Sequence, residues 1–167
     1  VIMARPEIKT VSDLAGKRVA AEGTALGAFV IARALEQHQV DPTTVDVLSI
    51  TVDESVIAYE NNQIDAIVTF EPFRTKLLNA GAVEIFSSKQ IPNEIVDVLV
   101  TRKSTIEKNA ASLRDFVAGW IAAVDLIKTS PEKVNPIIAH RLEITIEEAE
   151  LAYDGLQLPD LATNQSL

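Results

Sequence analysis

The sequence of 167 residues contains no cysteine, which excludes disulfide frameworks, thiolate zinc sites and cysteine nucleophiles. Glycine and proline are also few, six and seven residues, so collagen-like repeats and low-complexity disorder are excluded. Long hydrophobic runs are missing, because charged residues interrupt every apolar stretch well before the roughly 18 residues that a membrane-spanning helix needs. The composition that remains, 47% hydrophobic and 23% charged, is that of one globular domain or two small lobes.

Positive charge is scarce as well. The chain has 24 acidic and 15 basic residues, a formal charge of −9, and its densest basic sites are the pairs 17–18 and 102–103. A phosphate backbone would be repelled by such a surface, so we expect no nucleic-acid partner.

Short β-branched runs alternate with helical stretches in the first part of the chain. The expected strands are 17–21, 45–50, 64–70 and 83–86, and the expected helices are 25–38, 55–62 and 72–79. Strands that alternate with helices at this spacing pair in parallel, so the predicted fold class is α/β, a small parallel sheet flanked by helices. Asp53 is expected to cap the second helix, and Gly81 to end the third.

A last strand is expected at 95–100, and the pattern beyond it is purely helical. Apolar residues recur at helical spacing from Leu113 to Ile127 and form one stripe that includes Trp120. Ser130 and Pro131 open a second helix of this part. Thr145 and Glu148 form a capping box for a third, which Gly155 is expected to end.

The ligand crevice of an open parallel sheet lies outside the carboxyl ends of its strands. The connections expected at this edge are 22–27, 51–53 and 69–72. Gly23 lets a ligand approach the backbone, Thr24 offers a hydroxyl, and the amides from Thr24 and Ala25 onward belong to a positive helix end that suits a carboxylate, sulfonate or phosphate. Thr24 has the equal alternative of capping its own helix. Neither a Walker loop nor a dinucleotide fingerprint is present, which disfavours nucleotides.

Three carboxylates, Glu22, Asp53 and Glu71, are expected at the same edge. They could receive an amine or a cation, but Asp53 and Glu71 both stand where helix caps belong. His38 and His140 have no metal-ligand or triad spacing and are interpreted as helix-terminal residues. The residues show no grouping of nucleophile, base and orienting acid, so we expect no catalytic site, no metal and no cofactor.

Several segments carry a family resemblance: 8–20 with its Asp-Leu-Ala-Gly-Lys-Arg-Val run, 22–24, 62–68 and the pair Glu71-Pro72. Together they resemble the second lobe of the NMT1/THI5-like family, solute-binding proteins of ABC importers for sulfonates, nitrate and thiamine precursors with the type II periplasmic binding protein fold. By the family's pattern, Thr24 and the loop from Thr69 to Glu71 match ligand-facing positions. Asp65 matches a position with a loop-capping role.

The resemblance also implies an organisation. Residues 1–10 would be a hinge crossover, 11–92 the α/β second lobe, 93–101 a return crossover strand, and 102–167 a helical segment that packs on a first lobe absent from this chain. The sequence is therefore interpreted as a fragment. Because the stripe with Trp120 would then lack its partner, we expect homodimers formed by exchange of helices.

The function that the resemblance implies is capture of a small polar ligand, anionic or heterocyclic, for an ABC importer. The site residues are expected to be Gly23, Thr24, Ala25, Thr69 and Glu71. The partners would be the small-molecule ligand and an ABC permease, and the location periplasmic or extracellular, with membrane association through the transporter or a lipid anchor. The alternatives are the sensory domain of a membrane receptor, or an enzyme of this fold such as a thiamine-pyrimidine synthase or a menaquinone-pathway dehydratase. The synthases carry a cysteine-rich motif that this chain lacks, so we expect a binding protein and not an enzyme.

Overall fold

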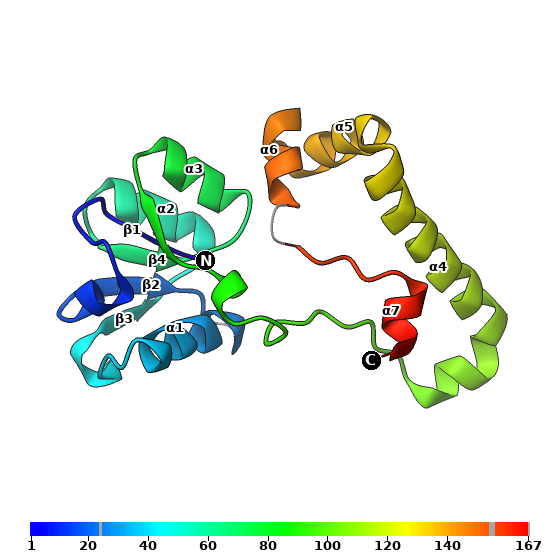
Figure 1. Cartoon of the computed structure of the whole chain (residues 1–167), viewed down its shortest axis with the longest axis horizontal. Coiled ribbons are helices and arrows are strands. Elements are labelled where there is room, and N and C mark those ends of the chain that lie inside the picture. The colour runs from blue at the N-terminus through cyan, green and yellow to red at the C-terminus, as the bar shows by residue number, and fades with distance from the viewer. Residues whose placement is uncertain (24, 154–155, 167) are drawn as a thin grey trace. The chain divides into compact units, whose positions relative to one another are not determined.

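The structure is a computed structural model that describes residues 1–23, 25–153 and 156–166. It divides into two compact units, Val1–Ile95 and Val96–Leu167 (Figure 1). The strands of the first unit are β1 (Ile2–Ala4), β2 (Arg18–Ala21), β3 (Asp46–Ser49), β4 (Ala66–Val68) and β5 (Val83–Phe86). Its helices are α1 (Ala25–Gln37), α2 (Val52–Glu60) and α3 (Phe73–Asn79), with 3-10 turns η1 (Val11–Leu14), η2 (Pro42–Thr44) and η3 (Ser88–Gln90). The predicted α/β class is confirmed.

The five strands form one sheet in the order β3-β2-β4-β1-β5. β2 pairs in parallel with β3 and β4, whereas β1 is antiparallel to both of its neighbours. The sheet is therefore mixed, which corrects the expectation of a parallel sheet. The strand that makes the difference is β1, whose three residues are all buried. A strand buried on both faces shows no alternation of apolar and polar residues, so periodicity does not reveal it.

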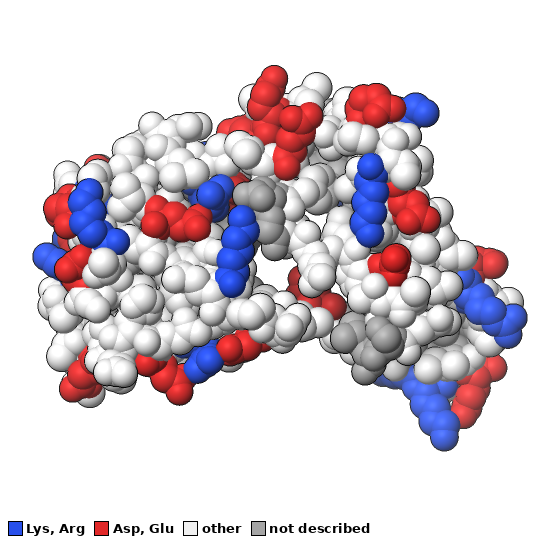
Figure 2. Space-filling view, in the orientation of Figure 1, with Lys and Arg blue, Asp and Glu red and all other residues white. Residues whose placement is uncertain are grey.

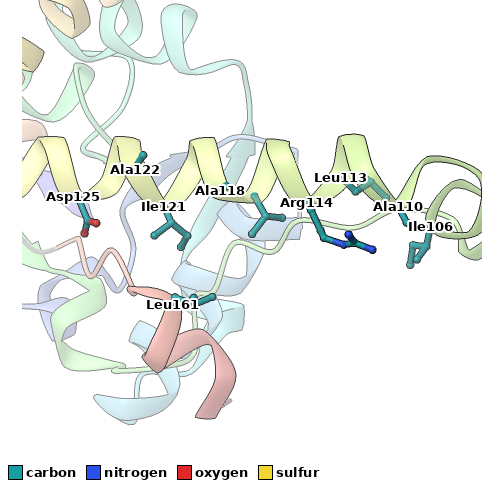
Figure 3. A pocket seen from close by; sticks show the side chains of 10 residues that line it. Ile106, Ala110, Leu113, Arg114, Ala118, Ile121, Ala122, Asp125 and Leu161 are labelled. Atoms are coloured by element: carbon teal, nitrogen blue, oxygen red, sulfur yellow. The ribbon is translucent and has the colours of Figure 1, made fainter.

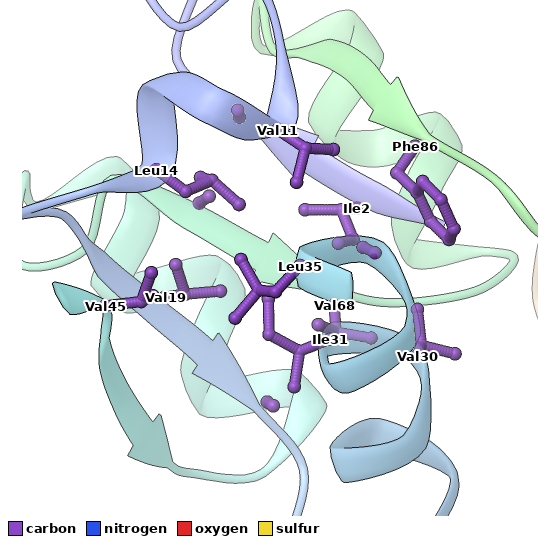
Figure 4. Packing of buried hydrophobic residues seen from close by; sticks show 14 of the residues in the cluster. Ile2, Val11, Leu14, Val19, Val30, Ile31, Leu35, Val45, Val68 and Phe86 are labelled. Carbon is purple, nitrogen blue, oxygen red and sulfur yellow. The ribbon is translucent and has the colours of Figure 1, made fainter. Parts of the chain in front are cut away.

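Helices cover both faces of the sheet, as predicted. The core on one face joins residues of the sheet, η1 and α1, and Figure 4 shows Ile31 and Leu35 of α1 among the side chains packed there. The core on the other face contains Ala20 and Ile67 of the sheet, together with Tyr59 of α2 and Leu77 of α3. Successive residues of β2 and β4 thus face opposite layers, which is why short strands suffice to carry two cores.

Two predictions about local structure are wrong. Asp53 does not cap α2: the N-cap is Thr51, whose hydroxyl accepts the Glu54 amide while the Glu54 carboxylate accepts from Thr51. Residues 96–101 form no strand, and Val100 is 81% exposed. The apolar pattern there is that of a strand, but a strand needs a hydrogen-bonding neighbour, and the described residues supply none.

The second unit is helical, as predicted, with α4 (Lys103–Thr129), α5 (Pro131–Leu142), α6 (Ile146–Ala152) and α7 (Leu161–Ser166). α5 has proline in its first turn, and α6 has the expected capping box of Thr145 and Glu148. Gly155, expected to end that helix, lies outside the described residues. The apolar stripe of α4 is largely uncovered: Val124 is buried, but Trp120 is 57% exposed.

Candidate functional site

The candidate site is the edge of the sheet at which β2, β3 and β4 end. These three strands run in the same direction, and the pairing sets Ala21 beside Ser49 and Ala20 beside Ile67. The connections that follow them therefore begin at one edge, where the amino ends of α1, α2 and α3 also begin. Of the expected site residues, the topology brings Gly23, Thr69 and Glu71 to this edge. Ala25 is the first residue of α1, and Thr24 lies outside the described residues.

Two glycines allow the start of α1 to approach the neighbouring backbone. A Cβ on Gly27 would lie 2.5 Å from the backbone carbonyl oxygen of Glu22, closer than real Cβ contacts. A Cβ on Gly23 would lie 2.7 Å from the Ser49 hydroxyl oxygen, at the end of β3. The first turn of α1 is therefore packed directly on the connection that follows β2, and Gly23 leaves backbone accessible there.

Thr69 follows β4 and is held by the sheet. Its amide donates to the Val1 carbonyl oxygen over 2.9 Å, and its side-chain oxygen lies 3.5 Å from the Phe70 carbonyl oxygen. The residue is only 3% exposed. The Thr69 hydroxyl is therefore sequestered in this structure.

Glu71 is held by the helix that it precedes. Its carboxylate accepts from the Thr75 amide at 3.1 Å and from the Thr75 hydroxyl at 2.9 Å, and it pairs with the Arg74 guanidinium at 3.0 Å. Arg74 in turn binds Glu84 of β5 at 2.7 Å. The Glu71 carboxylate thus satisfies an amide at the amino end of α3 that has no partner within the helix.

This geometry leads to a prediction for Glu71. Replacing it by alanine should lower the free energy of unfolding by about 1 kcal/mol, because a helix cap and an ion pair with Arg74 are lost. Glutamine should restore part of this, since its amide oxygen can still accept from Thr75. Urea denaturation followed by circular dichroism measures the difference. Unchanged stability together with lost ligand affinity would contradict the cap and assign the carboxylate to the ligand.

The other two expected carboxylates differ in their surroundings. Asp53 is an exposed residue in the first turn of α2, and Glu22 is partly buried in the connection after β2. The hydrogen bonds from Thr51 lower the pKa of the neighbouring Glu54. The start of α2 therefore carries negative charge, whereas the first turn of α1 contains no acidic residue. Among the helix ends at this edge, an anion is better suited to α1.

Sequence reasoning missed two apolar side chains at this edge. Phe70, between Thr69 and Glu71, is 50% exposed and meets the Phe73 ring edge to face at a centroid distance of 6.2 Å. Leu26, in the first turn of α1, is 46% exposed. The only signal in the sequence is an apolar residue placed directly after a predicted strand or at a helix start, which equally describes a core residue.

Asp65 ties β2 to β4 at the opposite edge. Its carboxylate accepts from the Arg18 amide at 2.9 Å and from two nitrogens of the Arg18 guanidinium at 2.9 and 3.1 Å. Arg18 also donates to the carbonyl oxygen of Asn62, in the turn before β4. These contacts fit the loop-capping role that the family pattern implies for Asp65.

The ion pair leads to a prediction about pH. Hydrogen bonds from Arg18 hold the pKa of Asp65 below its usual value in the folded state. The stabilisation is therefore complete above the unfolded pKa of about 3.9 and is lost as the pH falls through the lower folded pKa. Asp65→Asn should be less stable than the parent at neutral pH, and the gap should narrow in acid. Thermal unfolding at several pH values tests this, with Asp97→Asn, an exposed carboxylate, as control; a gap independent of pH would contradict it.

Other features of the described residues add no rival site. No group of three or more potential metal ligands occurs among them, and none of their helices is both long and apolar enough to cross a bilayer. On the face shown in Figure 2, basic side chains are interspersed with acidic ones instead of forming a patch. The second unit has an apolar trough along α4 that Leu161 faces (Figure 3). Its lining of alanine, leucine, isoleucine and valine side chains is typical of a packing surface.

Comparisons with known proteins agree on the fold. A putative aliphatic sulfonates-binding protein of Escherichia coli (strain K12) is 24% identical over 132 residues, 79% of this chain and 41% of that protein. The crystal structure of the periplasmic aliphatic sulphonate binding protein SsuA from Escherichia coli matches with a TM-score of 0.83 at 22% identity, over 92% of this chain and 51% of that one. The alkanesulfonate-binding protein SsuA from Xanthomonas axonopodis pv. citri, bound to MOPS, matches with a TM-score of 0.76 at 15% identity, over 99% and 60%.

The fold is not confined to binding proteins. The enzyme DSZB, in complex with biphenyl-2-sulfinic acid, matches with a TM-score of 0.72 at 14% identity, over 98% of this chain and 61% of that one. The chain thus spans about half the length of the relatives that it matches. The family model described as NMT1/THI5 like matches residues 1–134, most of the chain. The chain therefore belongs to the NMT1/THI5-like family.

Proposed function

We propose that this chain is part of a solute-binding protein that captures a small organic sulfonate for an ABC importer. The observation that carries the proposal is the family match over residues 1–134, which includes the whole sheet edge with Gly23 and the start of α1. Support for the ligand class comes from the relatives, whose names include an aliphatic sulfonate-binding protein and an alkanesulfonate-binding protein. A sulfonate is an anion that backbone amides at a helix start can bind.

The ligand would lie against the connections after β2 and β4. Gly23, Thr24 and Ala25 would present backbone amides and the Thr24 hydroxyl, and Thr69 and Glu71 would form the neighbouring wall. The Glu71 carboxylate is neutralised by Arg74, so it need not repel an anion. In a two-lobed binding protein, closure gains free energy from contacts that both lobes make with the ligand at once. This chain would supply one wall, and its own affinity should be weak.

Calorimetric titration of the complete gene product tests the proposal. Ethanesulfonate and benzenesulfonate should release or absorb heat on binding, while sulfate and nitrate should bind more weakly. Recovery of the sulfonate unchanged after incubation would support binding over the catalysis known for other proteins of this fold. Failure of both sulfonates to bind would overturn the proposed ligand class. A permease and an ATPase encoded beside the gene would support import, and a fused kinase or cyclase would indicate a sensor.

The proposed protein would work in the periplasm or outside the cell, with an ABC permease as its partner. The 167-residue chain alone is predicted to form homodimers, by exchange of helices, because Val98, Leu99 and Trp120 expose apolar surface. Light scattering should give a mass well above the 18.1 kDa of one chain. Trp120→Glu should shift the mass toward the monomer, while Lys108→Glu, an exposed polar residue of the same helix, should not. A monomer at every concentration would contradict the prediction.

A further inference from the structure

The connection after β4 places an aromatic ring beside the backbone proposed to bind the ligand. Ala20 of β2 pairs with Ile67 of β4, and the same register continued past the strand ends sets Gly23 beside Phe70. Phe70 is therefore the neighbour of the glycine that leaves backbone accessible at this edge. Its position follows from strand pairing and does not depend on the residues that the structure leaves undescribed.

The Phe70 ring is supported from one side and open on another. The Phe73 ring meets it at 6.2 Å and an interplanar angle of 85°, and Phe73 is itself only partly exposed. The backbone is fixed too, because the Phe70 carbonyl oxygen accepts from the Arg74 amide at 3.0 Å. Half of the Phe70 surface nevertheless remains exposed. The ring is thus held in place while much of its area is free for contact.

A second exposed apolar side chain lies in the neighbouring connection. Leu26 follows Gly23 by three residues, in the first turn of α1. A single exposed apolar residue is common on protein surfaces and needs no explanation. Here two of them belong to adjacent connections at the edge where a glycine exposes backbone. This arrangement provides polar backbone for an anionic headgroup and apolar side chains for what the headgroup carries.

We infer that Phe70 contacts the organic group of the ligand and selects sulfonates that carry an aromatic group over short alkyl sulfonates. The inference rests on the proposed function and goes beyond it by naming the residue that reads the organic group. Aromatic rings pack on one another edge to face or offset, and such pairs are stabilised beyond the burial of their area. A two-carbon chain offers much less surface to the ring, so it gains little from Phe70.

The test compares two ligands on matched variants of the complete gene product. Phe70→Ala should weaken benzenesulfonate binding about tenfold and ethanesulfonate binding less than about threefold, measured by calorimetric titration. Phe70→Leu should lie between the parent and alanine for benzenesulfonate. Leu78→Ala is the control, because it removes an exposed apolar side chain from α3 at the end away from the strand edge. Thermal unfolding of each apo variant verifies that it folds.

The outcomes separate the inference from the proposed function. A selective loss for benzenesulfonate in Phe70→Ala alone supports the inference. An equal loss for both sulfonates, or no loss for either, overturns it, because Phe70 then packs within the protein and does not read the organic group. If the parent protein binds neither sulfonate, the proposed function fails and the inference falls with it.

Discussion

Replacing Arg5 by alanine is expected to lower the free energy of unfolding by about 2–4 kcal/mol. The Arg5 guanidinium donates to the carbonyl oxygen of Tyr59 at 2.5 Å and to that of Ile64 at 3.0 and 3.2 Å. It also lies 4.6 Å from the centroid of the Tyr59 ring. Arg5 thus joins the segment after β1 to the end of α2 and to the turn that leads into β4.

The size of the expected effect follows from what the substitution leaves behind. Two carbonyl oxygens lose a charged donor in a partly buried place, and leaving such groups unsatisfied costs more than a typical hydrogen bond contributes. The cation–π contact with Tyr59 is lost as well. Urea denaturation followed by circular dichroism measures the change.

Two further variants control the Arg5 experiment. Arg5→Lys keeps the charge but lacks the planar fork that reaches both carbonyls, so it should recover only part of the stability. Lys9→Ala removes an exposed cation nearby in the sequence and should change the free energy of unfolding by less than about 0.5 kcal/mol. If Arg5→Ala unfolds like the parent protein, these contacts do not stabilise the fold.

The sequence predicts well those elements whose pattern is local. α1, β3, α3 and β5 lie within a few residues of their predicted bounds, because alternation, helical spacing and caps act over a few residues. β1 was missed because three fully buried residues show no period. The strand expected at 95–100 is absent because a strand is a property of two segments, and apolar spacing says nothing about a partner.

The candidate site was predictable in its place but not in its detail. Parallel pairing brings Gly23, Thr69 and Glu71 to one edge, and the alternation of strands and helices suffices to predict that pairing. The partners of these residues were not predictable, because the contact of Glu71 with Thr75 depends on how α3 begins. Phe70 was missed because its exposure is decided by the packing of Phe73 and not by its neighbours in the sequence.

Gly27→Ala is expected to destabilise the apo protein and to weaken ligand binding together. Alanine in place of glycine inside a helix usually stabilises it by about 0.5–1 kcal/mol. At Gly27 the new Cβ would lie 2.5 Å from the backbone oxygen of Glu22 and 3.2 Å from its nitrogen. Backbone atoms cannot rotate away, so α1 or the connection after β2 must move.

The contact with Glu22 decides the sign of the effect. Overpacking of this kind costs about 1–3 kcal/mol, which exceeds the gain in helix propensity, so a net loss of about 1–2 kcal/mol is expected in urea denaturation. Moving the start of α1 also displaces the amides proposed to bind the sulfonate. Affinity in the complete gene product should therefore fall about tenfold, which corresponds to about 1.4 kcal/mol.

Gly23→Ala is the matched control, since it adds the same methyl group four residues earlier. Its Cβ would meet the Ser49 hydroxyl, 2.7 Å away, and Ser49 is exposed, so that the side chain can rotate aside. Gly23→Ala should therefore unfold within about 0.5 kcal/mol of the parent protein. If it nevertheless weakens sulfonate binding, the ligand approaches the backbone at Gly23, as proposed. A Gly27→Ala protein as stable as Gly23→Ala, with its affinity intact, would instead show that the start of α1 can shift without cost and that the ligand does not depend on its position.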